Sequence, residues 1–223
     1  MKNHIINVES IEKVTSDVLK IICNKPPEFS FIPGQATEIV INKVGWENKK
    51  RPFTFTSLPS DNYLEFTIKT YPKHKSFTNE LLQLDVNDEL IMNDVFGAIK
   101  YQGEGVFIAG GAGVTPFISI LRDLKSKNEI GNNKLIFANK TKQDIINADE
   151  FKSLLGANFI NILSEEKSSH FAFGKISERF LKNHLSNSQK NIYLCGPPPM
   201  MEDVEAQIKK ISANLFTIVK ETI

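Results

Sequence analysis

The chain has 223 residues, 41% hydrophobic and 24% charged, which is the composition of a globular protein and excludes intrinsic disorder. Its 27 Lys and Arg residues balance 26 Asp and Glu residues, and the net charge of +1 excludes the basic surface typical of nucleic-acid-binding proteins. The longest apolar stretch, residues 106–121, is interrupted by glycines and a proline and is too short to cross a bilayer. We therefore expect no nucleic-acid partner and no membrane segment.

Residues 4 to about 100 have the pattern of antiparallel β-structure. Short β-branched segments alternate apolar and polar residues and are separated by turns rich in Pro, Gly, Asn and Asp. The expected strands are residues 4–14, 18–23, 36–42, 51–57, 64–71 and 89–96. One helix is expected at residues 76–84. Short strands at this spacing predict an antiparallel barrel or sandwich.

After Tyr101 the pattern changes to alternating strands and helices. Strands are expected at residues 105–111, 134–140, 159–164, 191–196 and 215–221, and helices at 115–127, 147–155, 177–184 and 199–211. This alternation predicts right-handed crossovers and a parallel sheet covered on both faces. The glycine-rich residues 102–105 are the expected boundary. We therefore predict two domains, residues 1–101 and 102–223.

A glycine-rich segment, Gly110–Pro116, connects the first expected strand of the second half to its helix. Bare backbone and a helix N-terminus suit the approach of a phosphate, although a glycine turn alone is equally often a plain connection. Its position at the first strand-to-helix turn favours a ligand site, because ligands bind at the carboxyl ends of parallel strands.

A second segment, Cys195-Gly196-Pro197-Pro198, follows the strand at residues 191–196. The prolines stiffen this turn and the glycine allows close access. A lone cysteine is more often an inert buried residue, but at the end of a parallel strand Cys195 becomes a candidate ligand contact.

The third segment is Arg51–Ser57 on an expected barrel strand. A guanidinium suits bidentate phosphate binding, and the hydroxyls of alternate residues share one face of a strand. An edge strand with an exposed arginine is the alternative interpretation. The other two arginines, Arg122 and Arg179, are expected on solvated helix faces.

Cys23 and Cys195 are the only cysteines, and no spacing of Cys or His matches a metal-binding motif. The N-terminal segment has no apolar signal-peptide core. We therefore expect a cytoplasmic protein with no disulfide and no metal site.

Together, the three segments resemble the ferredoxin–NADP reductase superfamily, whose order is Arg-x-Tyr-Ser/Thr, Gly-Gly-x-Gly-x-Thr-Pro and Cys-Gly-Pro-Pro. The resemblance extends from about His4 to Glu221. It implies an N-terminal six-stranded antiparallel β-barrel that binds FAD, followed by a parallel-sheet α/β domain that binds NADH or NADPH.

The resemblance also implies roles for individual residues. Arg51 would bind the flavin pyrophosphate, Phe53 would pack along the flavin, and Thr54 would contact flavin N5. The remaining cofactor contacts implied by the resemblance are Ile68, Lys69, Ser76, Phe77, Thr78, Gly111, Gly113, Thr115, Cys195, Gly196 and Pro197. Of these, the residues from Ile68 to Thr78 face the flavin, and those from Gly111 to Pro197 face the nicotinamide dinucleotide. Thr54 and Cys195 are the expected catalytic residues.

Two positions depart from the family pattern. Phe53 lacks the hydroxyl of the family's tyrosine, and Lys75 replaces the glycine that precedes the barrel helix. Both changes bear on the affinity for FAD. After the strand at residues 159–164 the chain continues with Glu165, where NADPH-using members carry arginine, and a carboxylate there favours NADH over NADPH. Lys140 and Lys167 keep NADPH open.

The expected function is a flavin-dependent NAD(P)H oxidoreductase that passes electrons to a separate small carrier protein such as ferredoxin or flavodoxin. Two alternatives stay open: a free-flavin or quinone reductase, and a non-catalytic nucleotide-binding electron-transfer subunit.

Overall fold

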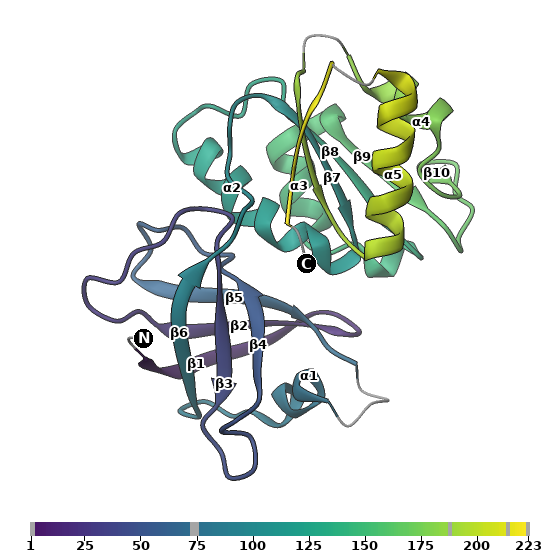
Figure 1. Ribbon diagram of the computed structural model, residues 1–223. Helices are drawn as coiled ribbons and strands as arrows, with labels where there is room; N and C mark the ends of the chain where they lie inside the picture. Colours follow the sequence, from purple (N-terminus) through teal and green to yellow (C-terminus); the bar gives the residue numbers. More distant parts are fainter. Residues whose placement is uncertain (1–2, 72–75, 187–188, 213–214, 222–223) are drawn as a thin grey trace. The chain divides into compact units, whose positions relative to one another are not determined.

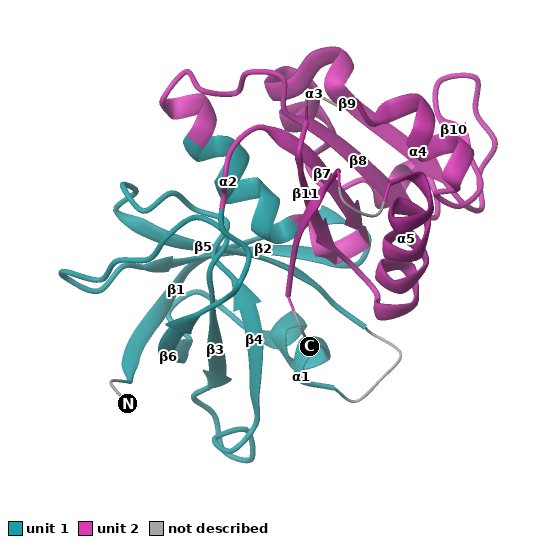
Figure 2. Ribbon diagram, turned by 45° about the horizontal axis from the view of Figure 1, so that its top comes forward, with its two compact units in different colours: residues 1–100, 115–123 teal, residues 101–114, 124–223 magenta. Residues whose placement is uncertain are grey.

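The structure, a computed structural model, describes residues 3–71, 76–186, 189–212 and 215–221. The chain divides into two compact units, shown in different colours in Figure 2. Unit 1 contains residues 1–100 and 115–123, and unit 2 contains residues 101–114 and 124–223. The first part of one helix, residues 115–123, therefore packs with the N-terminal half of the chain although it follows the start of the C-terminal half.

Unit 1 contains the predicted six-stranded antiparallel structure (Figure 1). The strands are β1 (His4–Thr15), β2 (Val18–Asn24), β3 (Ala36–Ile41), β4 (Lys50–Thr54), β5 (Tyr63–Lys69) and β6 (Glu89–Phe96). Their order is β4-β3-β6-β1-β2-β5, and an antiparallel bridge between Phe55 and Phe66 joins the two ends of the sheet. The prediction of an N-terminal antiparallel barrel is confirmed.

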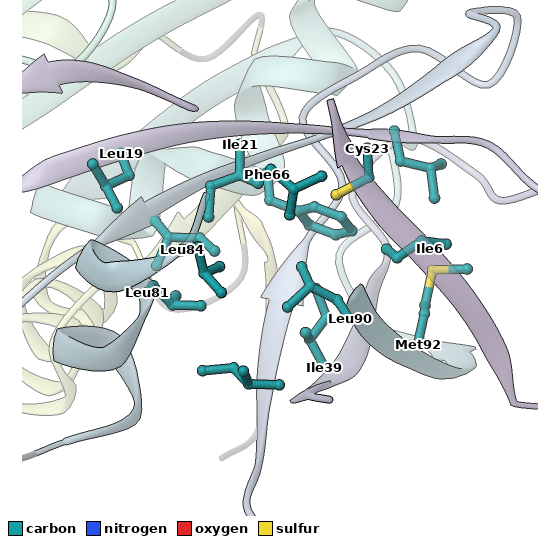
Figure 3. Close-up of a cluster of buried hydrophobic side chains, with 14 of the residues drawn as sticks. Ile6, Leu19, Ile21, Cys23, Ile39, Phe66, Leu81, Leu84, Leu90 and Met92 are labelled. Carbon is teal, nitrogen blue, oxygen red and sulfur yellow. The ribbon is translucent and has the colours of Figure 1, made fainter. Parts of the chain in front are cut away.

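The barrel interior is filled by the apolar side chains that alternate along these strands. Figure 3 shows Ile6, Ile21, Phe66, Leu90 and Met92 gathered in this core, and each is at most 1% exposed. Burial of each such side chain contributes about 1.5–3 kcal/mol. The period-2 pattern of the sequence therefore determines which face of each strand turns inward.

The barrel helix is shorter than expected. Helix α1 covers only Phe77–Glu80 and continues as a 3-10 turn, Leu81–Gln83. Ser76 caps it, because its Oγ accepts the Asn79 N–H at 3.3 Å. Phe77 and Leu81 are buried and fix the segment on the barrel core. Lys75 lies outside the described residues.

Unit 2 contains the predicted parallel sheet (Figure 1). Its strands are β7 (Gly105–Gly110), β8 (Lys134–Asn139), β9 (Phe159–Leu163), β10 (Ala172–Phe173), β11 (Asn191–Cys195) and β12 (Thr217–Lys220). Their order is β10-β9-β8-β7-β11-β12, with every pairing parallel. Strand β10 was not predicted, because two residues carry no periodicity.

Three helices of unit 2 cover both faces of this sheet: α3 (Ala148–Leu155), α4 (Glu178–His184) and α5 (Pro198–Ile211). Helix α2 (Thr115–Ser126) lies for the most part in unit 1. Helices α4 and α5 bury Leu181 and Val204 against one face, which includes Ile108 and Ile136. Phe151 of α3 packs edge-on against Phe137 of β8 on the other face, with ring centroids 6.3 Å apart. The predicted parallel α/β architecture is confirmed.

The strand order creates a switch point beside β7. The chain proceeds from β7 outward to β8, β9 and β10, then returns to place β11 on the opposite side of β7. Ala109 of β7 pairs with Cys195 of β11, so the turns that follow these two strands begin side by side. In open parallel sheets this is where ligands bind.

Within the described residues, no helix combines the length and the apolarity needed to cross a membrane. The same residues contain no group of three or more His, Cys, Asp or Glu side chains that could hold a metal ion. The thiols of Cys23 and Cys195 are both free.

Candidate functional site

The turns after β7 and β11 pack backbone against backbone. Gly110 ends β7, a 3-10 turn covers Gly111–Val114, and Thr115 begins α2. A Cβ on Gly113 would overlap the Cys195 carbonyl and lie only 2.6 Å from Gly196 Cα. Any side chain at residue 113 would therefore push the two turns apart, so glycine is required there.

Gly111 serves a different purpose in the same turn. Its φ is +51°, in the left-handed region that favours glycine, and a Cβ on it would meet nothing within 4 Å. The Cβ direction of Gly111 thus points into open space, where a ligand can approach, whereas that of Gly113 points into the other turn. The predicted roles of both residues toward the dinucleotide remain predictions.

Cys195 is half-buried at the end of β11. Burial raises the pKa of its thiol to about 12, and the Glu221 carboxylate adds to the shift. The thiol is therefore neutral near pH 7, which agrees with a positioning contact and not with a nucleophile.

The helix that follows Cys195 is poorly suited to binding a phosphate. Pro197 precedes α5, and Pro198 and Pro199 form its start, so two of the N–H groups that a helix N-terminus normally offers are absent. A neutral or cationic ring suits this turn better than an anion does.

Sequence reasoning missed Glu221. It follows β12, which runs parallel to β11 with Lys220 opposite Leu194. Burial raises the pKa of its carboxyl group, and this carboxyl contributes to the shift at Cys195. The two strands are parallel neighbours, so the residues at their carboxyl ends lie close together. A prediction of the strand order would therefore have placed Glu221 near Cys195.

On the barrel, the predicted flavin-binding residues Arg51, Phe53 and Thr54 lie on β4, which stands at one end of the sheet order and pairs with β3. Arg51 is exposed, and its Nη1 donates to the Lys50 carbonyl at 2.8 Å. Phe53 is half-buried, and its ring lies 5.9 Å from that of the buried Phe77. Because Phe77 packs against it, the Phe53 ring offers a fixed apolar surface on the same strand as the exposed Arg51 guanidinium.

Four other residues predicted on the flavin side have distinct environments. Ile68 is 3% exposed, so only its backbone is accessible to a cofactor, and Lys69 forms a 2.9 Å ion pair with Asp17. The hydroxyls of Ser76 and Thr78 lie 3.2 Å apart at the start of α1. Because α1 has a single turn, binding of a pyrophosphate here would depend on these hydroxyls and on the N–H groups of that turn. The predicted role of this helix start toward the flavin remains a prediction.

Thr54 and Thr115, predicted on opposite sides of the hydride transfer, are brought together within unit 1. The Thr115 hydroxyl donates to Thr54 Oγ1 at 3.4 Å. Thr54 ends β4 and Thr115 begins α2, so the barrel strand and the residue after the glycine turn share a contact.

The prediction that Arg122 lies on a solvated helix face is wrong. Its Nη1 donates to the Thr56 carbonyl at 2.7 Å and to Glu65 Oε1 at 2.7 Å. The Glu65 side chain is only 6% exposed. The barrel supplies a buried carboxylate, which the pattern of the helix could not reveal. Arg179, by contrast, is exposed as expected.

The residues after β9, which bear on the choice of nucleotide, carry balanced charges. Glu165 pairs with Lys140 at 3.1 Å, and both side chains are more than half exposed. The Glu166 carboxylate accepts the Lys142 N–H at 2.8 Å. The positive charge of Lys140 is therefore already paired with a carboxylate.

Two family models match the chain. The FAD-binding domain model matches residues 3–115, and the oxidoreductase NAD-binding domain model matches residues 107–206. The propane 2-monooxygenase reductase component of Rhodococcus jostii is 29% identical over 228 residues, covering 93% of this chain and 59% of that protein. NADH-cytochrome b5 reductase 1 of Aspergillus terreus is 30% identical over 182 residues, covering 73% of this chain and 60% of that protein.

A solved structure has the same two-unit fold over its whole length. The ferredoxin NADP+ reductase of Neisseria gonorrhoeae, with bound FAD and NADP, has a TM-score of 0.85 at 16% identity, with 99% of this chain and 98% of that chain covered. At this identity the likeness concerns the fold. The chain itself spans about 60% of the length of the two curated relatives. With both family models matched in order along one such fold, the chain belongs to the ferredoxin–NADP reductase-like superfamily of FAD- and NAD-binding oxidoreductases.

Proposed function

We propose that the chain is a FAD-dependent NAD(P)H oxidoreductase that takes hydride from a nicotinamide dinucleotide and delivers electrons to a separate acceptor. The observation that carries this proposal is the packing of the Gly111–Val114 turn against the Cys195 turn at the sheet's switch point. Beside this packing, the half-buried Gly111 has open space in its Cβ direction, where a dinucleotide can bind.

The barrel residues fit FAD by their chemistry. The exposed Arg51 guanidinium suits the pyrophosphate, and Phe53, supported by Phe77, offers a flat surface to the flavin ring. The hydroxyls of Thr54, Ser76 and Thr78 supply further hydrogen bonds, and Ile68 and Lys69 offer backbone groups. When bound, FAD supplies the electron-accepting ring that links a two-electron donor to an electron carrier.

The contribution of the protein to catalysis is alignment. Thr54 would orient the reacting edge of the flavin through its hydroxyl. Cys195, with Gly196 and Pro197, would position the nicotinamide ring through an uncharged thiol and a stiff turn. Gly111, Gly113 and Thr115 would hold the rest of the dinucleotide. Fixing both partners in one geometry converts a bimolecular encounter into an oriented one, which can supply a large part of the rate enhancement.

The nucleotide that these residues favour is NADH. Glu165 pairs with Lys140, so the basic charge that would bind a 2′-phosphate already has an acidic partner. A second carboxylate, Glu166, lies next to it in the chain and is bound to the Lys142 N–H. A phosphate would be repelled by these carboxylates, whereas a ribose 2′-hydroxyl can donate to one of them.

The acceptor is proposed to be a separate electron-carrier protein. The matched Rhodococcus jostii protein is named as the reductase component of a monooxygenase, and the Aspergillus terreus protein as a cytochrome b5 reductase. Both names place the acceptor on another protein or module. A ferredoxin or flavodoxin is the acceptor class we propose, and the cytoplasm is the proposed location.

An anaerobic absorbance titration tests the proposal. Purified protein reconstituted with FAD is titrated with NADH, and separately with NADPH, while the flavin band near its visible maximum is followed. Bleaching on addition of one equivalent of nucleotide is expected, and NADH should bleach the flavin faster. A protein that takes up no FAD, or binds FAD that neither nucleotide reduces, would contradict the proposed activity. Faster reduction by NADPH would contradict the preference alone.

A further inference from the structure

Helix α2 carries a polar stripe on one face. Thr115, Ser119 and Arg122 are spaced i, i+4 and i+7, so they lie on the same side of the helix. The helix is otherwise strongly apolar over these turns, with Phe117, Ile118 and Leu121 fully buried. Ser119 is itself completely buried. A polar stripe within a buried helix requires partners, because an unsatisfied buried polar group costs about 1–3 kcal/mol.

Each member of the stripe meets a polar group of the barrel. Thr115 Oγ1 donates to Thr54 Oγ1 at 3.4 Å, and Ser119 Oγ accepts the Gly34 N–H at 3.1 Å. Arg122 donates to the Thr56 carbonyl and to Glu65, both at 2.7 Å. All of these residues belong to unit 1. The helix is therefore held by directional bonds along nearly its whole length.

Glu65 is the centre of the strongest of these contacts. Its Oε1 accepts from Arg122 and also from Thr56 Oγ1, at 2.8 Å. The Thr56 hydroxyl in turn lies 3.2 Å from that of Thr67. The Ser57 hydroxyl accepts the Glu65 N–H at 3.0 Å. One carboxylate oxygen thus accepts two bonds, and a third bond fixes the backbone of the same residue, so the carboxylate cannot shift without breaking the network.

A buried ion pair is a poor means of stabilising a fold. Desolvation offsets much of the attraction between the two charges, and apolar residues of similar volume are often equally stabilising. What a fixed carboxylate and a rigid guanidinium provide is a defined register, because Nη1 donates to both acceptors and the planar group fixes where that nitrogen lies. Here the register is that of α2 against residues 54–56, at the end of β4 and just after it.

We propose that Arg122 and Glu65 are positioning residues: their pair fixes α2 on the barrel so that Thr115 meets Thr54. Thr54 is the proposed flavin N5 contact, and Thr115 directly follows the turn proposed to bind the dinucleotide. The pair would therefore set the alignment for hydride transfer without touching either cofactor. This inference rests on the proposed function for its catalytic consequence, but the fixing of α2 can be tested without it.

The test compares single and double replacements. Arg122→Met alone leaves the Glu65 charge buried without its cation, and should lower the melting temperature by roughly 10 °C. Glu65→Gln combined with Arg122→Met removes both charges, and should recover most of that loss. If the pair sets the register, flavin reduction by NADH in the double variant remains about 10-fold slower than in the wild type, although stability has recovered. The NADH concentration that gives the half-maximal rate should change little.

Hydrogen–deuterium exchange provides a readout that needs no catalysis. In the double variant, the amides of residues 115–122 should exchange at least 10-fold faster than in the wild type, while the strands of unit 2 keep their protection. If the wild type is not reduced by NADH, the proposed function fails, and the exchange measurement still decides whether the pair fixes α2.

A matched control removes another ion pair of the barrel. Glu12 of β1 and Lys20 of β2 form a 2.6 Å pair that includes an exposed carboxylate. Glu12→Gln with Lys20→Met should change neither the flavin reduction rate nor the exchange of residues 115–122. A double variant of the Arg122 pair with wild-type reduction and wild-type exchange would overturn the inference.

Arg122→Lys keeps the test decisive if the double variant does not fold. Lysine preserves the charge, but its ammonium ends one bond short of the position of Arg122 Nη1 and is not held in a plane, so it can bind the same two acceptors only if α2 moves toward them. We expect this variant to fold, and to show slower flavin reduction together with faster exchange in α2. Wild-type values of both quantities for Arg122→Lys would also overturn the inference.

Discussion

Two regions of the molecule hold proposed ligand-binding residues in place by different means. At the ends of β7 and β11, the fit depends on the absence of side chains, because Gly113 lies directly against the Cys195 turn. Along α2, the fit depends on polar side chains, of which Arg122 and Glu65 form the strongest contact. A close backbone contact allows no substitution, whereas a polar contact can be weakened in steps. The two regions should therefore respond very differently to mutation.

The largest effect is expected from Gly113→Ala. The new Cβ would overlap the backbone of Cys195 and Gly196, which cannot move aside as a flexible side chain can. The turn must shift, and we expect flavin reduction by NADH to fall at least 100-fold, because misplacement by about 1 Å can have an effect of this size. FAD binding to the barrel should be unchanged. Stopped-flow absorbance measures the first quantity and flavin fluorescence titration the second.

Gly111→Ala is the matched variant in the same turn. Its Cβ meets nothing within 4 Å, so the substitution costs only the strain of a left-handed backbone, about 1 kcal/mol. It should raise the NADH concentration needed for half-maximal reduction more than it lowers the limiting rate. Equal losses of limiting rate in the two variants would show that the contact between the turns is not what distinguishes Gly113.

A smaller effect is expected from Cys195→Ala, which removes a side chain while leaving the backbone contact intact. Because burial raises the pKa of the thiol to about 12, the group acts as a neutral contact and not as a nucleophile. Hydride transfer should slow about 10-fold, and FAD should bind as in the wild type. Cys195→Ser should recover part of the rate, since serine has the same shape as cysteine with a hydroxyl in place of the thiol. An unchanged reduction rate in Cys195→Ala would remove the cysteine from the proposed alignment.

The same contrast explains what could be predicted from the sequence. The order of strands and helices, and the placement of Gly113 and Cys195 at strand ends, follow from local periodicity and from turn residues that leave few alternatives. Arg122 was misplaced, because its environment depends on Glu65, 57 residues earlier in the chain. Glu221 was missed because its neighbour Cys195 is set by strand order. Contacts between distant segments leave no local pattern.

The smallest predicted effect concerns the barrel core and its dependence on pH. Cys23 is fully buried, and burial raises the pKa of its thiol to about 12, with the charge of Glu9 as the lesser cause. In the unfolded chain the thiol ionises near pH 9, while in the folded protein it stays protonated. Its contribution to stability is therefore fully present below pH 9 and is lost as the pH rises toward 12, by at most about 1.4 kcal/mol per pH unit.

Chemical denaturation between pH 8 and pH 10.5 measures this dependence. Cys23→Ala should be less stable than the wild type at pH 8, because it leaves a small cavity, but its free energy of unfolding should fall less steeply above pH 9. Cys195→Ala provides the comparison from the turn region, where burial raises the pKa of the thiol equally, to about 12, and the change in slope should be of similar size. Identical slopes for wild type and Cys23→Ala would mean that the thiol ionises equally in both states. The core around β2 would then admit more water than its burial implies.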